Sequence, residues 1–419
     1  MRIPYVKRVA NDTLLFNAEN LSNLSKLSMN ATCDKDGNIK YYGYTDTQSD
    51  LFNKTVRGMA RAGEKIFYYT DTGKLYYVQK LKVTDTALNV LYEMPTILEI
   101  VKNGEHLALI LDGNGTGYTI DSEGGTMTYS FPIGRVACTY NGMLFIAHLN
   151  ELYFSAPMDC TNFTMNLNQG GVIKTDKNDG DIVSLVVQDN KLLVFTTRAI
   201  YEFTAFGERI DYTLKKIETI VPSIRMFSAK DCGKKTLFIS GDKLCSYENR
   251  KITEVNSVLS RENLVINGYP AVDKSVYYVP VSDVYGNNRI LRYDTENDIE
   301  CLIDCDYSVI SDGGYTMNKN GMLIFIEENG ELVKNYSFTS KVLDFETAKD
   351  KVIHEISMIC DATGILTVHG DCGERTFTLK KGSNVKRMNI PSNSFTLTFS
   401  GGSKFNAQHI KIKYRIKGE

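Results

Sequence analysis

Short apolar runs separated by polar turns recur along most of the chain. The stretch 180–202 contains two of them, at residues 182–187 and 192–196, and most of a third, at 200–203, with the polar turn 188–191 between the first two. The runs are rich in β-branched and aromatic residues, which are typical of strands, and polar residues separate them at short spacing. This pattern predicts three consecutive antiparallel strands.

Seven modules of this kind can be aligned by the first apolar residue of their hairpin. The starts are 37 to 48 residues apart, close to the roughly 40–50 residues of a four-stranded propeller blade. A single blade buries its faces only against its neighbours, so a closed ring of blades is expected. The spacing predicts an all-β fold with a β-propeller of about seven (six to eight) blades; unrelated hairpins in sandwiches or in an irregular meander are the alternative. The seven starting residues are Ile66, Leu107, Leu144, Leu192, Leu237, Val276 and Leu323.

The first part of the chain does not repeat. Residues 1–55 contain a short helical pattern at 19–30 and a turn-rich stretch at 33–48 that is typical of a hairpin with an aromatic second strand. We interpret residues 1–55 as an extension that closes the propeller or docks on another protein.

The pattern changes again after the repeats. Residues 56–337 form the predicted propeller, and its last hairpin is expected to join 322–326 with 331–336. Residues 338–419 contain strands with strict alternation of polar and apolar positions, as in Thr376–Leu379, separated by glycine-containing turns. This region is predicted to be a C-terminal antiparallel β-sandwich.

Composition narrows the class of protein. The 419 residues carry a net charge of -2, with 42% hydrophobic and 23% charged residues, which is typical of a soluble globular protein. The overall charge lacks the basic excess of most nucleic-acid-binding proteins. No apolar leader and no run of about 20 apolar residues is present, so neither a signal peptide nor a membrane span is predicted. The nine scattered cysteines indicate reduced thiols in a protein made in a cytosol.

One segment is locally basic. After residue 375 the cations outnumber the acids, and aromatic residues are not interleaved with them as they are in many single-strand-binding proteins. A solvated sheet face or a contact with an acidic neighbouring subunit is therefore favoured over contact with nucleic acid. The cations are Lys380, Lys381, Lys386, Arg387, Lys404, Lys411, Lys413, Arg415 and Lys417.

Possible metal ligands do not form a known pattern. His369 with Cys360 and Cys372 is the nearest to a cluster, but the spacing matches no zinc motif, and Cys301 with Cys305 matches no redox motif. None of the other histidines belongs to a metal-binding motif; these are His106, His148, His354 and His409.

Two loops resemble ligand-binding motifs only in part. The stretch 34–38 (Asp-Lys-Asp-Gly-Asn) begins like a calcium loop, but its glycine comes at the fourth position and no glutamate stands at the twelfth. The glycine-rich loop 112–117 is followed by a strand pattern and offers no helix N-terminus to a phosphate. We interpret both as turns between strands, and no catalytic, cofactor-binding or metal-binding residue is predicted.

Enzymatic functions of propellers are disfavoured. Sialidase-like propellers carry repeated Asp-box motifs that end in Trp, and this chain has no Trp. Glycosidases need a pair of carboxylates, and no local motif nominates one among the 50 acidic residues. A lectin-like pocket motif repeated at one blade position is also not found. The expected function is non-enzymatic.

Several segments together resemble the tail hub, or nozzle, proteins of tailed bacteriophages. These segments are 56–59 (Val-Arg-Gly-Met), 65–68, 74–78, 117–118, 140–146 (Tyr-Asn-Gly-Met-Leu-Phe-Ile), 152–163 and 179–185. The most specific is 155–163, in which Ser-Ala-Pro-Met-Asp is followed by Asn-Phe after a blade strand.

The resemblance implies a structural protein of the virion tail, made in the bacterial host cytoplasm. Such a protein would form a homo-oligomeric ring around the channel through which DNA leaves, and it would dock to other tail or connector proteins without an active site. DNA would pass non-specifically, and the near-neutral charge suits a channel wall because a strongly basic wall would bind phosphates. The alternative is a carbohydrate-binding propeller that attaches to glycans on a host surface.

Overall fold

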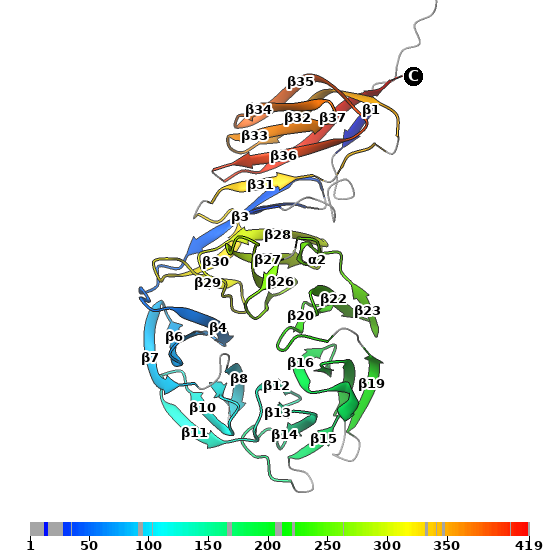
Figure 1. The fold of residues 1–419 in the computed structure, drawn as a ribbon. Coiled ribbons are helices and arrows are strands. Elements are labelled where there is room, and N and C mark those ends of the chain that lie inside the picture. The colour runs from blue at the N-terminus through cyan, green and yellow to red at the C-terminus, as the bar shows by residue number, and fades with distance from the viewer. Residues whose placement is uncertain are drawn as a thin grey trace, which may run out of the picture. The chain divides into compact units, whose positions relative to one another are not determined.

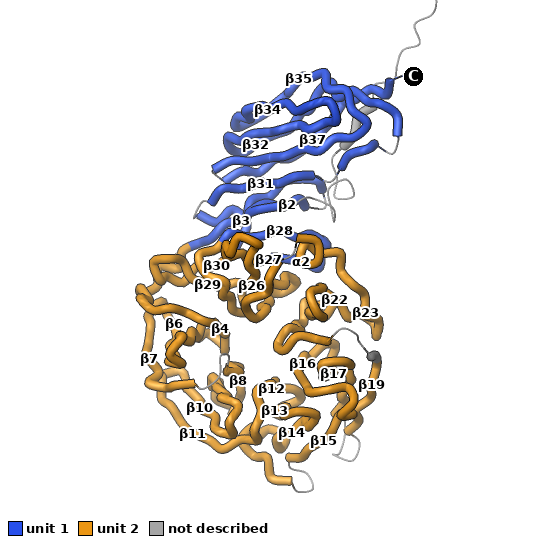
Figure 2. The backbone as a smooth tube through the Cα atoms, in the orientation of Figure 1, with its two compact units in different colours: residues 1–45, 291–304, 326–419 blue, residues 46–290, 305–325 orange. Residues whose placement is uncertain are grey.

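The structure is a computed structural model that describes residues 12–15, 28–34, 36–90, 95–102, 104–165, 170–205, 212–219, 223–262, 264–331, 334–340, 342–345, 348–402 and 404–417. It is nearly all β, with the short helical segments η1 (Lys177–Asp179) and α2 (Val258–Arg261). The chain divides into two compact units (Figure 2). Unit 1 comprises residues 1–45, 291–304 and 326–419, and unit 2 comprises residues 46–290 and 305–325.

Unit 2 contains five sheets that each consist of four consecutive antiparallel strands. Figure 1 shows them around a common centre, with the first strand of each sheet innermost, which is the blade arrangement of a β-propeller. The sheets are β4 (Val56–Ala62), β5 (Lys65–Thr70), β6 (Lys74–Gln79) and β7 (Lys82–Asn89); β8 (Thr96–Lys102), β9 (Glu105–Leu111), β10 (Thr116–Ile120) and β11 (Thr126–Ser130); β12 (Val136–Tyr140), β13 (Met143–His148), β14 (Glu151–Phe154) and β15 (Gly171–Lys174); β16 (Ile182–Gln188), β17 (Lys191–Thr196), β18 (Ala199–Thr204) and β19 (Thr213–Thr219); and β20 (Lys230–Asp231), β21 (Thr236–Ser240), β22 (Lys243–Glu248) and β23 (Lys251–Glu254).

Seven further strands follow these sheets, and the division between the units passes through two of them, β27 and β30. The number of complete blades therefore stays a prediction. The strands are β24 (Val265–Ile266), β25 (Ala271–Asp273), β26 (Val276–Ser282), β27 (Asn288–Asp294), β28 (Ile299–Asp304), β29 (Tyr315–Met317) and β30 (Leu323–Glu328).

Apolar clusters between neighbouring modules hold unit 2 together. One cluster joins the sheet β12–β15 to the sheet β16–β19 and contains the fully buried Phe145 and Phe203. Another joins the first module to the last, because Tyr68 and Tyr76 pack in one cluster with Met317 and Leu323. The segment before the first module takes part in this closure, since the backbone N–H of Phe52 donates to the carbonyl oxygen of Gly321 at 2.8 Å.

Unit 1 contains a β-sandwich whose two sheets enclose one apolar cluster. One sheet contains β3 (Ile39–Asp46), β37 (Ala407–Ile416), β32 (Lys351–Cys360) and β35 (Gly382–Ser392) in that order, with β2 (Ala31–Cys33) paired to β3 and β1 (Asp12–Leu15) paired to β37. The other has the order β31 (Tyr336–Thr339), β36 (Phe395–Gly401), β33 (Gly364–Gly370) and β34 (Gly373–Leu379). Strands from both ends of the described chain therefore share one sheet.

The structure confirms the all-β fold of propeller sheets and a C-terminal sandwich. The three strands of 180–202 form β16, β17 and β18 in antiparallel register, and the hairpin at 33–48 forms from β2 and β3. The hairpin predicted between 322–326 and 331–336 is wrong, because β31 pairs with β36, where Phe338 faces Phe399. The helical pattern at 19–30 lies mostly outside the described residues.

The predicted domain boundaries at 55/56 and 337/338 remain predictions. No helix in the described segments is long and apolar enough to cross a membrane. All nine cysteines lie in described segments and none forms a disulfide.

Candidate functional site

The centre of unit 2 contains a cavity of about 740 Å³. Seven segments line it, and each precedes one of the seven apolar hairpin starts recognised in the sequence. This position follows from the fold, because the first strand of a blade lies innermost. The lining segments are 59–64, 96–99, 136–139, 184–187, residues 227 and 229–231, 269–271 and 310–312.

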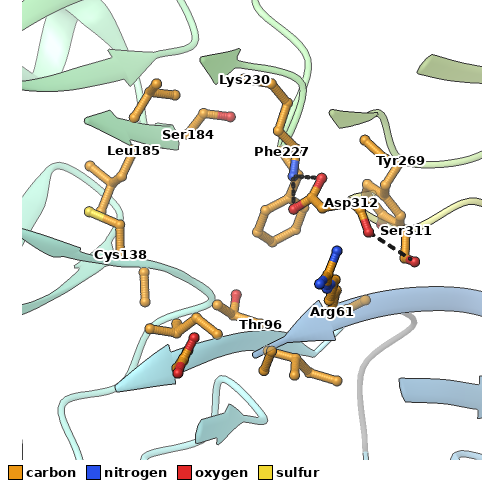
Figure 3. Close-up of a pocket in the computed structure, with 18 of the residues that line it drawn as sticks. Arg61, Thr96, Cys138, Ser184, Leu185, Phe227, Lys230, Tyr269, Ser311 and Asp312 are labelled. Atoms are coloured by element: carbon orange, nitrogen blue, oxygen red, sulfur yellow. Dashed lines mark hydrogen bonds and ion pairs between the residues drawn. The ribbon is translucent and has the colours of Figure 1, made fainter. Parts of the chain in front are cut away.

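A charged cluster lies on one side of this cavity (Figure 3). The Lys230 ammonium donates to both carboxylate oxygens of Asp312 at 3.3 Å. The same carboxylate accepts from the backbone N–H of Val272 at 2.9 Å. One aspartate thus joins three segments of the cavity wall that are far apart in the sequence.

Arg61 approaches the same cluster from β4. Its guanidinium lies against the backbone of Gly313, because a Cβ at that glycine would be 2.6 Å from Nη1. It also lies over the ring of Tyr315 at 5.8 Å from the centroid, and its Nε donates to the carbonyl oxygen of Gly63 at 3.0 Å. Arg61 and Lys230 are thus the two cations of the cavity lining, which also contains the carboxylates of Glu64, Glu99, Asp231 and Asp312.

The other lining residues that are labelled in Figure 3 are uncharged. Phe227 and Tyr269 form an edge-to-face pair with ring centroids 5.4 Å apart. Cys138, Ser184 and Leu185 lie on the opposite side of the view from the charged cluster (Figure 3). A volume within the range of roughly 300–1,000 Å³, with aromatic and charged groups on one side, suits a small polar ligand.

Asp231 is the cavity carboxylate with an upward pKa shift. Burial raises its pKa and the negative charge of Asp189 adds to the effect, while a hydrogen bond from the backbone N–H of Gly233 at 3.0 Å opposes it. Such a shift marks a candidate for proton transfer, although structural networks produce the same shift. Among the described residues, no group of three or more His, Cys, Asp or Glu side chains could hold a metal ion.

The structure does not bring the sequence-nominated ligands into one site. Cys360 is buried in the sandwich core, whereas Cys372 is exposed in a turn. His369 lies 3.0 Å from the Glu374 carboxylate across β33 and β34. Cys301 is buried on β28.

The two candidate loops are turns between strands, as the sequence predicts. Asp34 accepts through Oδ1 from the backbone N–H groups of Asp36 at 3.0 Å and Asn38 at 2.9 Å, so this carboxylate oxygen stabilises the β2–β3 turn. The glycine-rich loop 112–117 connects β9 to β10.

Sequence reasoning did not nominate any residue of the cavity. Lys230 and Asp312 are 82 residues apart, and neither lies in a local motif. The available signal was positional: a charged or polar residue on the first strand of a module, such as Arg61 or Thr96, points to the centre once a propeller is assumed.

A buried carboxylate elsewhere in unit 2 provides a contrast to Asp231. Asp179, at the end of η1, accepts hydrogen bonds from the Tyr201 hydroxyl and from the Lys216 ammonium, the latter at 2.6 Å. Burial acts to raise the pKa of Asp179, but these two hydrogen bonds and the charge of Lys216 outweigh it and leave the pKa below its ordinary value.

Neutralising these two aspartates should change stability in opposite directions. Asp179→Asn removes a group that stabilises the fold when ionised, so the Tm at neutral pH should fall by several degrees, and the deficit should shrink as pH falls through the lowered pKa. Asp231→Asn removes a charge that burial disfavours, so the Tm at neutral pH should equal or exceed that of the wild type, and the difference should vanish in acid. Thermal unfolding of both variants between acidic and neutral pH tests this. Equal effects of the two substitutions would contradict it.

The sheets and their innermost cavity define the class: this chain is a β-propeller protein with an added β-sandwich. No protein-family model and no curated protein matches the sequence. Solved structures with a similar fold include a streptogramin B lyase, at 12% identity and a TM-score of 0.47, covering 69% of this chain and 98% of that one. BamB from Moraxella catarrhalis is 12% identical with a TM-score of 0.41, covering 75% and 96% of the respective chains. PorZ of Porphyromonas gingivalis is 10% identical with a TM-score of 0.43, covering 80% and 46%.

Proposed function

We propose that this protein is a non-enzymatic structural component of a bacteriophage or prophage tail, of the hub or nozzle kind. In this role several copies form a ring around the DNA exit channel, and the ring docks to neighbouring tail or connector proteins. The protein is made in the cytoplasm of the bacterial host and belongs to the tail of the virion.

The observation that supports the proposal is that charged side chains at the centre of unit 2 connect segments of the cavity wall. The Asp312 carboxylate accepts from Lys230 and from the backbone of Val272, so its hydrogen bonds join wall segments of the cavity. A carboxylate in this role connects segments of the cavity wall and has a structural task in the ring of blades. Together with the sequence resemblance to tail hub proteins, this favours a scaffold over an enzyme.

The proposed role is tested in the phage or prophage genome that encodes the chain. We expect deletion of the gene to yield particles that lack part of the tail or lose their packaged DNA, with infectivity restored when the wild-type chain is supplied in trans. Immunogold electron microscopy should place the protein at the tail. Unchanged particles and titre after deletion would contradict the proposal.

The alternative function, adhesion through carbohydrate binding, is tested by a separate measurement. Glycan-array binding by the purified chain that is lost in Tyr269→Ala, with no defect in tail assembly, would favour a carbohydrate-binding propeller. Tyr269 is the appropriate residue because it contributes an aromatic ring to the cavity, and sugars stack on such faces.

A further inference from the structure

The lining of the central cavity in unit 2 contains more carboxylates than cations. Two cations stand against four carboxylates, so the lining has a formal charge of −2 when all six side chains are ionised. Lys230 is held by Asp312, because its ammonium donates to both carboxylate oxygens. The negative excess therefore belongs to the other three carboxylates, which are Glu64, Glu99 and Asp231.

Asp231 lies away from the ion pair of Lys230 and Asp312. It follows Lys230 on the short strand β20, and side chains alternate between the two faces of a strand. The charge that acts on the Asp231 carboxylate is that of Asp189, and its hydrogen bond comes from the backbone N–H of Gly233 at 3.0 Å. Burial and the Asp189 charge both raise the pKa of Asp231. A positive charge bound beside this carboxylate would therefore stabilise its ionised form.

The Glu99 carboxylate lies over the turn between β4 and β5. A Cβ on Gly63 in this turn would be 3.3 Å from Cδ of Glu99 and 3.4 Å from both carboxylate oxygens. Glu64 is the next residue of the turn and also lines the cavity. Glu99 contacts Nδ1 of His106, which is uncharged in the formal count at pH 7, and the Glu99 side chain is still 40% exposed. The cavity thus has carboxylates on two separate parts of its wall.

The second cation of the lining, Arg61, has other contacts. Its Nε donates to the carbonyl oxygen of Gly63 at 3.0 Å, and its guanidinium lies over the ring of Tyr315. Neither of these contacts involves a carboxylate. A ligand in the cavity therefore meets three carboxylates and one cation outside the Lys230–Asp312 pair.

An aromatic pair lines the same cavity. The rings of Phe227 and Tyr269 lie edge to face, with centroids 5.4 Å apart and planes at 78°. Figure 3 shows both residues beside the ion pair of Lys230 and Asp312. The face of an aromatic ring attracts a cation that comes within about 6 Å of its centroid. The aromatic pair and the carboxylates therefore favour a ligand of the same charge.

Other classes of ligand fit this lining less well. An anion would be repelled by the carboxylates, and a neutral sugar would leave their charge uncompensated. In the described segments no group of three or more His, Cys, Asp or Glu side chains could hold a metal ion, and about 740 Å³ is much larger than one ion needs. An organic cation fits, because its ammonium groups pair with carboxylates and its C–H groups pack on aromatic rings.

We propose that the central cavity of unit 2 binds an organic ammonium ion of the polyamine class through Asp231, Glu99 and the aromatic pair of Phe227 and Tyr269. A polyamine suits the cavity better than a single ammonium group, because the carboxylates lie on different segments of the wall and a flexible chain with several charges can reach them. This inference goes beyond the proposed tail function and does not depend on it.

Titration calorimetry of the full-length chain with spermidine tests the site. We expect saturable binding of one spermidine per chain, and at least ~10-fold weaker binding by Asp231→Asn and by Tyr269→Ala. Asp231→Asn is suitable because it should be at least as stable as the wild type at neutral pH. Spermidine should also raise the Tm of the wild type more than that of either variant, since a ligand that binds the native state stabilises it.

Two matched variants remove the same groups outside the cavity. Asp242→Asn neutralises an exposed aspartate in the turn between β21 and β22, and Tyr285→Ala removes a side chain that is 87% exposed. Both should bind spermidine like the wild type. Triethylene glycol, a neutral chain with as many non-hydrogen atoms as spermidine, should not bind.

Several results would overturn this proposal. They are a wild type that does not bind spermidine, equal binding by the wild type and Tyr269→Ala, and a loss in Asp242→Asn as large as that in Asp231→Asn, which would indicate attraction to acidic groups in general. Binding of triethylene glycol as tight as that of spermidine would also overturn it. None of these results bears on the tail function, which the deletion and the immunogold labelling decide.

Discussion

Replacing Phe203 by alanine is expected to lower the free energy of unfolding of unit 2 by about 3–5 kcal/mol, the usual effect of deleting a buried aromatic ring. Phe203 is fully buried. Its ring centroid lies 5.2 Å from Phe145, 5.8 Å from Tyr212, 6.4 Å from Phe154 and 6.5 Å from Tyr140. These rings come from two neighbouring sheets, so the substitution opens a cavity between blades.

Two variants control for this substitution. Phe203→Leu keeps most of the buried volume and should cost less than about 1.5–2 kcal/mol. Met127→Ala removes a side chain that is 64% exposed and should leave stability within about 0.5 kcal/mol. Because the chain has no Trp, calorimetry is the appropriate measurement of unfolding. A Phe203→Ala protein as stable as Met127→Ala would show that the ring does not join the sheets.

Replacing Gly321 by alanine is expected to destabilise unit 2 by about 2–5 kcal/mol through two effects. Gly321 has a φ of +83°, a conformation that costs an L residue roughly 1–2 kcal/mol. A Cβ there would also overlap the carbonyl oxygen of Phe52 and lie 2.8 Å from its carbonyl carbon and 2.9 Å from its backbone nitrogen. These neighbours are backbone atoms, so relief requires the chain to move where the first module meets the last.

Gly286→Ala separates the two effects. Gly286 has a φ of +80°, but a Cβ at this position would meet nothing within 4 Å. We expect it to cost only the backbone contribution of about 1–2 kcal/mol. Calorimetry of both variants gives the difference, and limited proteolysis should cut Gly321→Ala faster near its closure segment. Equal destabilisation by the two substitutions would contradict a steric role for Gly321.

Local patterns were sufficient for the blades because blade strands pair with their sequence neighbours. In β16 to β18, the register from Gln188↔Lys191 to Phe195↔Ile200 follows from alternation and from two short turns. The same reasoning failed at β30 and β31, where two apolar strands follow each other but do not pair. The partner of β31 is β36, and the pair Phe338↔Phe399 spans 61 residues, a distance at which no local pattern identifies a partner.

The sequence could predict the position of the cavity but not the residues that meet in it. A propeller implies a centre lined by first strands, and Arg61 is on such a strand. The contact between Lys230 and Asp312 forms only when the blades close into a ring. The periodicity of the sequence does not specify which residues then come together. The basic segment after residue 375 was recognisable as a charge cluster in the sequence, but its placement on the strands of unit 1 required the fold.

The sheet shared by both ends of the chain limits how the protein is made. Thr13 pairs with Lys413, and β37 lies between β1 and β32 in the same sheet. At roughly 5–20 residues per second, β37 leaves the ribosome about 20–80 s after β1. The blades can form during translation, whereas the edges that β1 and β32 present to β37 stay unpaired until β37 has been synthesised. Such edges recruit other chains, so truncated or stalled products of this protein should aggregate through the sandwich and not through the propeller.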